Sequence, residues 1–442
     1  LAGQHLKAGF GNGFKQAKSL NGLSPYALGF RGSIKAFYDA LANGSAIDQR
    51  FSPEAATRIM ALVNKVGDVA LPLIGDAPIA PKRSPTKTPT VLVIGGTGFI
   101  GRYLTRALAA ENLGVRVFSR GRPAIFDDIS DKVSVFSGSL KNKEDIKAAM
   151  AGIDTVYHLA KAEEKTWDGY VENDVKVTQM IAECALEIGI KRFIYTGTID
   201  SYDASKPDRT ITEQTGLDPQ VEERNLYARS KAACEALLTK MHKDENLPLV
   251  IVRPGIVIGE GGPLQHWGIG RWAGAGAVKI WGPGKNILPL VLVEDVADGL
   301  VKAMSVAGIE GQSFNLIGEP MMSALDYFDE IHRRLGARIN VSSGSIPLYY
   351  ASDLLKHTLK KYVLRKQNLK KPVFRDWKSR TQSSPFANAK AKSGLGWTPE
   401  QDKESFIQRA IVRANLFGFT GPKSPSVDAA KPVTQLVEKK QA

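Results

Sequence analysis

The sequence predicts an α/β fold in which a doubly wound parallel sheet is followed by a smaller C-terminal part and preceded by a mostly helical segment. Two observations lead to this prediction. Apolar residues 90–94 run into the glycine cluster 95–101, and apolar residues at helical spacing follow at once. Strand and helix patterns then alternate, which is typical of a parallel sheet covered on both faces. The expected strands are 90–95, 114–119, 132–136, 154–159, 191–197, 248–253 and 312–316.

The residues in front of the sheet follow a different pattern. Residues 1–75 contain too few strand patterns for a sheet of their own, and two helices are expected there. The first begins after Ser33 and ends at Gly44. The second opens with Ser52 as its N-cap and Pro53 in its first turn.

Two further segments are predicted to lack a fold of their own. Residues 76–89 contain four prolines and three basic residues, a composition that favours an extended linker. Residues 418–442 are rich in Pro, Lys, Ser and Ala and are predicted to be disordered. The chain begins with Leu1 rather than Met, which favours a fragment or a processed chain.

The composition favours a cytoplasmic protein. The two cysteines, Cys184 and Cys234, both fall in helical patterns and argue against a disulfide framework. A signal peptide and an apolar run of about 18 residues are both lacking, so the sequence predicts no transmembrane helix. The six histidines show no metal-binding spacing, and we expect no metal site.

The positive charge of the chain, +14 in all, is concentrated in residues 351–400, which hold twelve Lys or Arg and three acids. We expect a solvated face rather than a nucleic-acid site. Residues 352–366 predict a basic amphipathic helix whose apolar side covers the C-terminal part and whose basic side lies in water. The alternative is a weak contact of residues 351–380 with an anionic membrane. The apolar side is marked by Leu355, Leu359 and Val363.

The glycine cluster has the spacing of a phosphate-binding turn between a strand and a helix. Backbone N–H groups of such a turn and the helix dipole attract a pyrophosphate. Gly95 permits the turn, Gly98 lets a phosphate approach, and Gly101 lets the helix pack on the strand. The sequence therefore predicts a dinucleotide site formed by Gly95, Thr97, Gly98, Phe99, Ile100 and Gly101.

A phenol and an ammonium group lie four residues apart, at Tyr227 and Lys231, which places them on one face of a helix. A nearby ammonium favours the phenolate, so we expect Lys231 to lower the pKa of Tyr227 and to make it a general acid and base. Lys231 can also bond the ribose of a nicotinamide cofactor. Thr198, at the end of an expected strand, is placed to hold the substrate oxygen.

In this order the motifs resemble those of extended short-chain dehydrogenase/reductases, and residues 90 to about 400 resemble the NAD(P)-dependent epimerase/dehydratase group. The resemblance implies a Rossmann-type fold with Thr198, Tyr227 and Lys231 as catalytic residues. It also implies cofactor contacts at Leu140, Ala160 and Pro254. Further matches are the helix at Asn173, Val177 and Thr178, the segment 293–297, and the closing Leu395-Gly396-Trp397-Thr398-Pro399.

The resemblance also divides the chain. Residues 90–255 are expected to bind the dinucleotide and residues 256–417 the substrate, with late sheet elements at about 291–317. Residues 1–75 resemble the C-terminal end of a Gfo/Idh/MocA-type oxidoreductase, so we expect the remnant of a preceding enzyme domain there. That resemblance rests on Gly29-Phe30, the run from Phe37 to Leu41, Gly44 and Ser52-Pro53-Glu54.

The expected cofactor is NADP, with NAD as the alternative. NAD-preferring members of the family place an acid after the second strand, where it bonds the adenosine ribose. Here that strand ends in Ser119-Arg120-Gly121-Arg122, and an arginine can bind a 2′-phosphate. The adenine-contacting Asp-Leu of the family is replaced by Ser139-Leu140.

The expected reaction is hydride transfer between nicotinamide and a secondary alcohol or ketone of a small molecule, expected to be a sugar or nucleotide-sugar derivative. The acid pair of sugar dehydratases is incomplete at Ile199-Asp200, and the diphosphate-binding Asn of epimerases is Ile256 here. The alternatives are a nucleotide-sugar epimerase without net redox change and a non-catalytic dinucleotide-binding sensor or scaffold. By analogy with the family we expect a homodimer.

Overall fold

The computed structural model describes residues 35–45, ten residues between 52 and 65, and residues 86–414 except for short gaps. The chain divides into two units, Leu1–Ala80 and Pro81–Ala442, which are described separately. The gaps, all in the second unit, are 122–123, 205, 207–208, 264–265, 275–276, 320, 338, 366–368, 370 and 382.

In the first unit, residues 35–42 are helical and Gly44 follows with a φ of 62°. The Ser52 hydroxyl accepts the N–H of Ala55 at 3.1 Å, as expected of an N-cap. Both features agree with the two predicted helices. Outside the described residues lie Ser33, Pro53, most of the linker 76–89, Arg122 and the tail 418–442.

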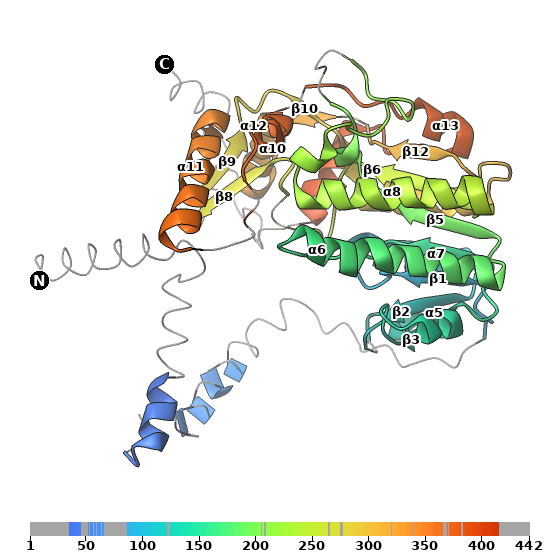
Figure 1. Ribbon diagram of the computed structural model, residues 1–442, viewed down its shortest axis with the longest axis horizontal. Coiled ribbons are helices and arrows are strands. Elements are labelled where there is room, and N and C mark those ends of the chain that lie inside the picture. Colours follow the sequence, from blue (N-terminus) through green and yellow to red (C-terminus); the bar gives the residue numbers. More distant parts are fainter. Residues whose placement is uncertain are drawn as a thin grey trace, which may run out of the picture. The chain divides into compact units, whose positions relative to one another are not determined.

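The second unit is built on a seven-stranded sheet in the order β12-β6-β5-β4-β1-β2-β3, in which every neighbouring pair is parallel. All seven predicted strands are present, so the predicted fold class is confirmed (Figure 1). Their bounds are β1 Val91–Ile94, β2 Val115–Ser119, β3 Val133–Ser137, β4 Thr155–His158, β5 Arg192–Thr196, β6 Leu249–Pro254 and β12 Ser313–Leu316.

Helices cover both faces of the sheet. Along β1, Val91 and Val93 face one apolar core and Leu92 and Ile94 face the other, which explains the unbroken apolar run. The first core includes α4 (Phe99–Ala110) and α9 (Val293–Ser305). The second core includes α5 (Lys143–Met150), α7 (Lys176–Ile188) and α8 (Leu226–Glu245). Two short elements precede α7, the helix α6 (Trp167–Tyr170) and the π-helical η3 (Val171–Val175).

The C-terminal part holds three small sheets around a third apolar core. Parallel β7 (Ile256–Ile258) and β11 (Leu290–Leu292) form one, and antiparallel β10 (Ile287–Leu288) and β13 (Met322–Ser323) form another. The third joins β8 (Gly270–Gly274), β9 (Ala277–Trp281) and β14 (Asn340–Gly344). The helices are α10 Ala324–Leu335, α11 Ile346–Thr358, α12 Phe374–Lys378, α13 Ala389–Leu395 and α14 Lys403–Ile407.

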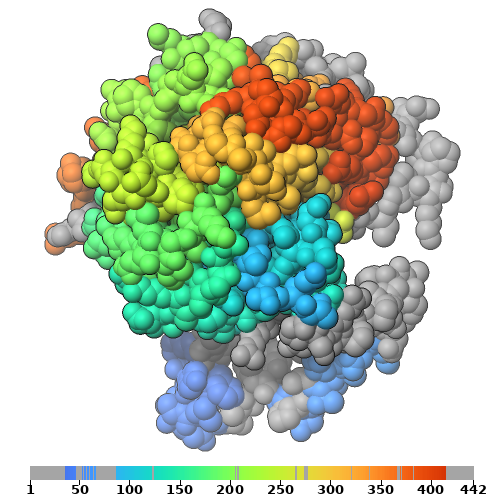
Figure 2. All heavy atoms as spheres, turned by 90° about the vertical axis from the view of Figure 1, so that its right-hand side faces the viewer, coloured from blue at the N-terminus to red at the C-terminus, as the bar shows by residue number. Residues whose placement is uncertain are grey.

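The end of the described chain returns to the large sheet. The buried Trp397 donates its indole N–H to the carbonyl oxygen of Asp295 at 2.8 Å, and α13 contacts β12. Figure 2 shows this side of the molecule, where red atoms near the C-terminal end lie beside orange atoms from around residue 300. The remaining short turns are η2 Ala124–Ile129, η4 Ile199–Ser201, η5 Val221–Glu223, η6 Leu359–Val363, η7 Ser379–Thr381 and η8 Gln408–Arg413.

The basic helix lies the opposite way round from the prediction. α11 begins at Ile346, before the predicted start at residue 352, and its inner side is formed by Tyr349 and Tyr350. These rings pack near Trp281 and Trp377, so the side that carries Leu355 faces water instead. Among the described residues, no helix is long and apolar enough to cross a membrane.

Candidate active site

The glycine cluster forms the predicted turn between β1 and α4. Gly95 has a φ of 91°, which other residues rarely adopt. A Cβ atom on Gly101 would lie 2.1 Å from the carbonyl oxygen of Gly95, so only glycine lets the helix approach the turn. Thr97 and Gly98 are exposed, and α4 has no side-chain cap among the described residues. Its first N–H groups therefore fit a pyrophosphate.

The loop that follows β7 rests on the start of α4. The Arg102 side chain donates a hydrogen bond to the carbonyl oxygen of Gly261 at 2.6 Å. The Phe99 ring packs so closely that a Cβ atom on Gly262 would lie 2.8 Å from it. The helix that carries the glycine turn therefore also holds the loop 259–262.

Two of the predicted catalytic side chains meet at the carboxyl end of β5. Thr198 follows β5, Tyr227 lies in the first turn of α8, and the Thr198 hydroxyl is close enough to the phenol to lower its pKa. Asn225 fixes the start of α8 because its side chain accepts the N–H of Ala228 at 2.9 Å. Thr198 is buried and Tyr227 is partly exposed, so a substrate oxygen can reach the phenol.

Lys231 lies behind this pair but does not act on the phenol as the sequence predicts. Its buried ammonium donates to the Tyr195 hydroxyl and to the carbonyl oxygen of Thr196, both at 3.2 Å. Burial raises the pKa of Tyr227 to about 12, and the hydrogen bond from Thr198 offsets this only in part. The pKa of Tyr227 is therefore raised in this structure and not lowered as expected, because desolvation is the largest contribution.

Asp174 is a buried carboxylate that the sequence reasoning missed. It accepts the Ser230 hydroxyl at 2.6 Å and the N–H of Ala162 at 3.3 Å. Burial lowers the pKa of Lys231, and the negative charge of Asp174 opposes that shift. Asp174 lies in the π-helical turn η3, a feature that is frequent at functional sites and has no clear sequence signature.

Lys161 follows Ala160, one of the expected cofactor contacts, and no role was predicted for it from the sequence. Its ammonium nitrogen lies 5.4 Å from the centre of the Tyr227 ring, within the range of a cation–π contact. The Lys161 side chain remains half exposed and pairs with the still more exposed Glu163 at 3.0 Å. An accessible cation therefore lies beside the phenol.

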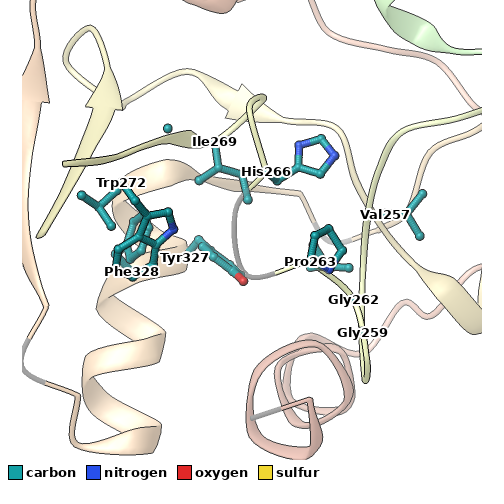
Figure 3. A pocket seen from close by; sticks show the side chains of 12 residues that line it. Val257, Gly259, Gly262, Pro263, His266, Ile269, Trp272, Tyr327 and Phe328 are labelled. Atoms are coloured by element: carbon teal, nitrogen blue, oxygen red, sulfur yellow. The ribbon is translucent and has the colours of Figure 1, made fainter. Parts of the chain in front are cut away.

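A pocket with a cavity volume of about 20 Å³ lies between β7, β8 and α10 (Figure 3). One of its polar lining groups is His266, whose pKa burial lowers to about 4, with a further contribution from Lys161. The charge of Lys161 acts on both His266 and Lys231, although neither Tyr227 nor Lys231 lines the pocket. Most of the lining is apolar and includes Val257, Ile258, Ile269, Trp272, Val278 and Phe328.

The other predicted cofactor residues follow strands of the large sheet at their carboxyl ends, where open α/β sheets bind ligands. Arg120 follows β2 and is exposed, and Leu140 follows β3 and packs against the core. The N–H of Ala160 bonds the carbonyl oxygen of Ile94 at 3.1 Å, which holds the turn after β4 against β1. Pro254 ends β6 and is buried.

A buried ion pair joins α8 to β6 below this edge. Arg253 bonds the carboxylate of Glu235 at 2.6 Å and the hydroxyl of Tyr202 at 2.7 Å. Tyr202 in turn donates to the Asn315 side chain at 2.8 Å. A Cβ atom on Gly197 would lie 2.1 Å from the Glu235 carboxylate, so glycine is required after β5. This ion pair of Arg253 and Glu235 was not predicted from the sequence, although Glu235 lies one helical turn after Lys231.

Three relatives illustrate what the chain is similar to. The 3β-hydroxysteroid-dehydrogenase/decarboxylase isoform 1 of Arabidopsis thaliana is 25% identical over 349 residues, 72% of this chain and 78% of that protein. The decarboxylating sterol-4-α-carboxylate 3-dehydrogenase of Candida albicans is 24% identical over 352 residues, 73% and 96% of the two chains. The 2-alkyl-3-oxoalkanoate reductase of Shewanella oneidensis is 26% identical over 220 residues, 48% and 56%.

Coverage of these relatives varies. The chain spans 63% of the length of the first curated relative that it matches, an uncharacterized protein of Sinorhizobium fredii. Among solved structures, UDP-glucuronic acid 4-epimerase of Bacillus cereus in complex with NAD has a TM-score of 0.56 at 20% identity. That match covers 74% of this chain and 99% of the epimerase, and it shows a common fold.

The family model for the NAD dependent epimerase/dehydratase family matches residues 91–316, from β1 to the end of β12. This range is just over half of the chain, and it contains the glycine turn, Thr198, Tyr227 and Lys231. The chain belongs to the NAD dependent epimerase/dehydratase family.

Proposed function

We propose that this protein is an NAD(P)-dependent oxidoreductase that interconverts a secondary alcohol and a ketone. The observation that carries the proposal is the proximity of Thr198 to Tyr227, at the carboxyl edge of the same sheet that presents the glycine turn. A phenol that is partly exposed is suited to proton exchange with a substrate oxygen. A sensor or scaffold would not need this pair.

A bound nicotinamide would supply or accept the hydride, and the residues of the chain would handle the proton. In ketone reduction, the Tyr227 phenol gives its proton to the substrate oxygen while Thr198 holds that oxygen in place. In alcohol oxidation, the phenolate takes the hydroxyl proton back. Lys231 provides a buried positive charge below the pair, and its contacts to Tyr195 and Thr196 fix its position.

The pocket favours a substrate in which the alcohol is carried by an apolar skeleton. Its branched and aromatic lining offers few partners to the hydroxyl groups of a sugar, whereas burial of apolar surface contributes about 25 cal/mol per Å². His266 has a pKa of about 4 and is neutral at physiological pH, so it adds no charge to this lining. The sugar substrate expected from the family resemblance is therefore less well supported than an apolar one.

Lys161 supports a finer assignment, a carboxylate near the reacting carbon. Its accessible ammonium lies beside the Tyr227 ring, where a negative group of the substrate would pair with it. The relatives point the same way: two are named for hydroxysteroid or sterol-carboxylate oxidation with decarboxylation, and one for reduction of 3-oxoalkanoates. We therefore propose 3-hydroxy or 3-oxo carboxylates on an apolar skeleton as substrates.

Turnover on a matched substrate panel tests this function. The purified chain is offered NADP or NAD with apolar 3-hydroxy acids, the corresponding neutral esters, and nucleotide sugars. We expect cofactor reduction with the 3-hydroxy acids, and slower reduction with the esters. Epimerisation of a nucleotide sugar without net cofactor consumption would instead support the epimerase alternative.

Replacing Lys161 by methionine is expected to raise the KM for the 3-hydroxy acid about tenfold to a hundredfold. The reason is the loss of a charge-assisted hydrogen bond, worth about 1.5–3 kcal/mol. The KM for the neutral ester should change little. The matched control is Lys165→Met, in the same loop and also exposed. Equal effects on acid and ester would contradict a role in carboxylate binding.

The preference for NADP remains a proposal supported by Arg120, which is exposed after β2 where NAD-preferring relatives place an acid. We expect Arg120→Glu to weaken NADPH binding by at least about tenfold, because a phosphate contact is replaced by repulsion. NADH binding should be unchanged or stronger. Fluorescence titration with both cofactors measures the two affinities. The control is Lys191→Glu, an equal charge change directly before β5, at the opposite edge of the sheet. Unchanged NADPH affinity would refute the role of Arg120.

A further inference from the structure

One side of the helix α11 packs against the rest of the C-terminal part, and the turn η6 continues this helix. Ile346 is buried, and the Tyr349 ring stacks on Trp377 with 5.4 Å between ring centres. Tyr350 meets Phe374 edge to face at a similar distance. This packing fixes the rotation of α11 about its axis, so the residues on its opposite side are held towards solvent.

That opposite side is apolar and carries no charge. Leu348, Leu355 and Tyr362 are 71%, 62% and 70% exposed, and Val363 is 68% exposed. Spacings of seven and fourteen residues place the first three in one stripe along a helix. We call this stripe the outer face of α11; it consists of Leu348, Ala351, Ser352, Leu355, Thr358, Leu359, Tyr362 and Val363.

Basic residues flank the outer face. Residues 346–365 contain four Lys or Arg and a single acid, Asp353, which pairs with Lys356 at 3.4 Å. Lys361 and Arg365 are exposed beside the apolar stripe. Long basic side chains can extend along an apolar surface and keep their charge at its edge. The segment therefore combines an uncharged apolar face with cationic borders.

We infer that the outer face of α11 docks on the surface of an anionic lipid bilayer. An apolar stripe that carries a tyrosine and has lysine borders is the pattern of a helix lying in a membrane interface, where acyl chains take the apolar face and lipid phosphates take the lysines. A second copy of the chain fits less well, because its own cationic borders would meet those of the first. The inference does not depend on the proposed reaction.

Co-sedimentation with vesicles of phosphatidylcholine, with or without phosphatidylserine, tests this inference on the full chain. We expect binding to the anionic vesicles that weakens with salt, and little binding to the neutral ones. The double variant Leu355→Glu/Tyr362→Glu should lose at least about tenfold in affinity. Ile125→Glu, at an exposed apolar residue in η2, should bind like the unchanged protein.

Results of two kinds, on vesicle binding and on oligomeric state, would overturn the inference. One is binding by the double variant that equals that of the unchanged protein, or equal binding to both kinds of vesicle. The other is a dimer in light scattering that the double variant converts into a monomer, because the outer face would then belong to a contact between copies. Circular dichroism and cofactor binding check that the variants fold, which is expected since both side chains are exposed.

Discussion

Replacing Tyr227 by phenylalanine is expected to reduce kcat/KM for the alcohol by about a hundredfold to ten-thousandfold, the usual contribution of a general acid or base. The phenol supplies the proton that the substrate oxygen needs, and its partner Thr198 cannot replace it because it lacks comparable acidity. Cofactor affinity, measured by fluorescence, should stay close to that of the unchanged protein. An activity that survives the substitution would show that the proton comes from another group.

The pH dependence of the unchanged protein provides a second readout of the same group. Burial raises the pKa of Tyr227 to about 12, so the phenolate needed for oxidation becomes more populated as the pH rises. We expect oxidation to accelerate with pH, whereas reduction, which uses the protonated phenol, stays level until the phenol ionises. In the phenylalanine variant the rise in oxidation should disappear. A profile identical in both proteins would contradict the assignment.

The second large effect is on stability. Replacing Glu235 by glutamine is expected to lower the free energy of unfolding by about 3–5 kcal/mol, because it leaves the Arg253 charge buried without its counterion. Both side chains are less than 10% exposed, so water cannot take the place of the carboxylate. Urea denaturation followed by circular dichroism measures the change.

Glu187→Gln provides the matched control for this substitution. Glu187 also makes two ion pairs, with Lys143 and Lys147 at 2.6 Å, but its side chain is 42% exposed. Water and salt screen such pairs, and the loss should be below about 1 kcal/mol. If the two variants lost the same stability, burial would not be the cause of the effect at Glu235.

The large sheet was predictable because its strands carry their signals locally. In β1 and β6 each residue is buried, which produces apolar runs that only Arg253 interrupts, and the turn after β1 needs glycine for reasons visible in the sequence. The proximity of Thr198 and Tyr227 could likewise be predicted, since both residues are identified from the order of the motifs.

The small sheets and the electrostatics were not predictable in the same way. β10 and β13 are two residues long, too short for an alternating pattern. The direction of the pKa shift at Tyr227 depends on desolvation, and the sequence shows only that Lys231 lies one turn away. The position of Lys161 beside the phenol depends on the path of the loop after β4. The orientation of α11 depends on aromatic packing with Trp281 and Trp377, which are distant in sequence.

The loop 259–262 gives the two ligand sites a common wall. Gly259 and Gly262 line the pocket, while Gly261 is bonded to Arg102 in the helix that begins at the glycine turn. A displacement of the start of α4 would therefore be passed through the hydrogen bond from the Arg102 side chain to the wall of the pocket. If the glycine turn binds the cofactor and the pocket binds the substrate, the two affinities are linked, and by thermodynamic reciprocity each ligand alters the binding of the other by the same factor.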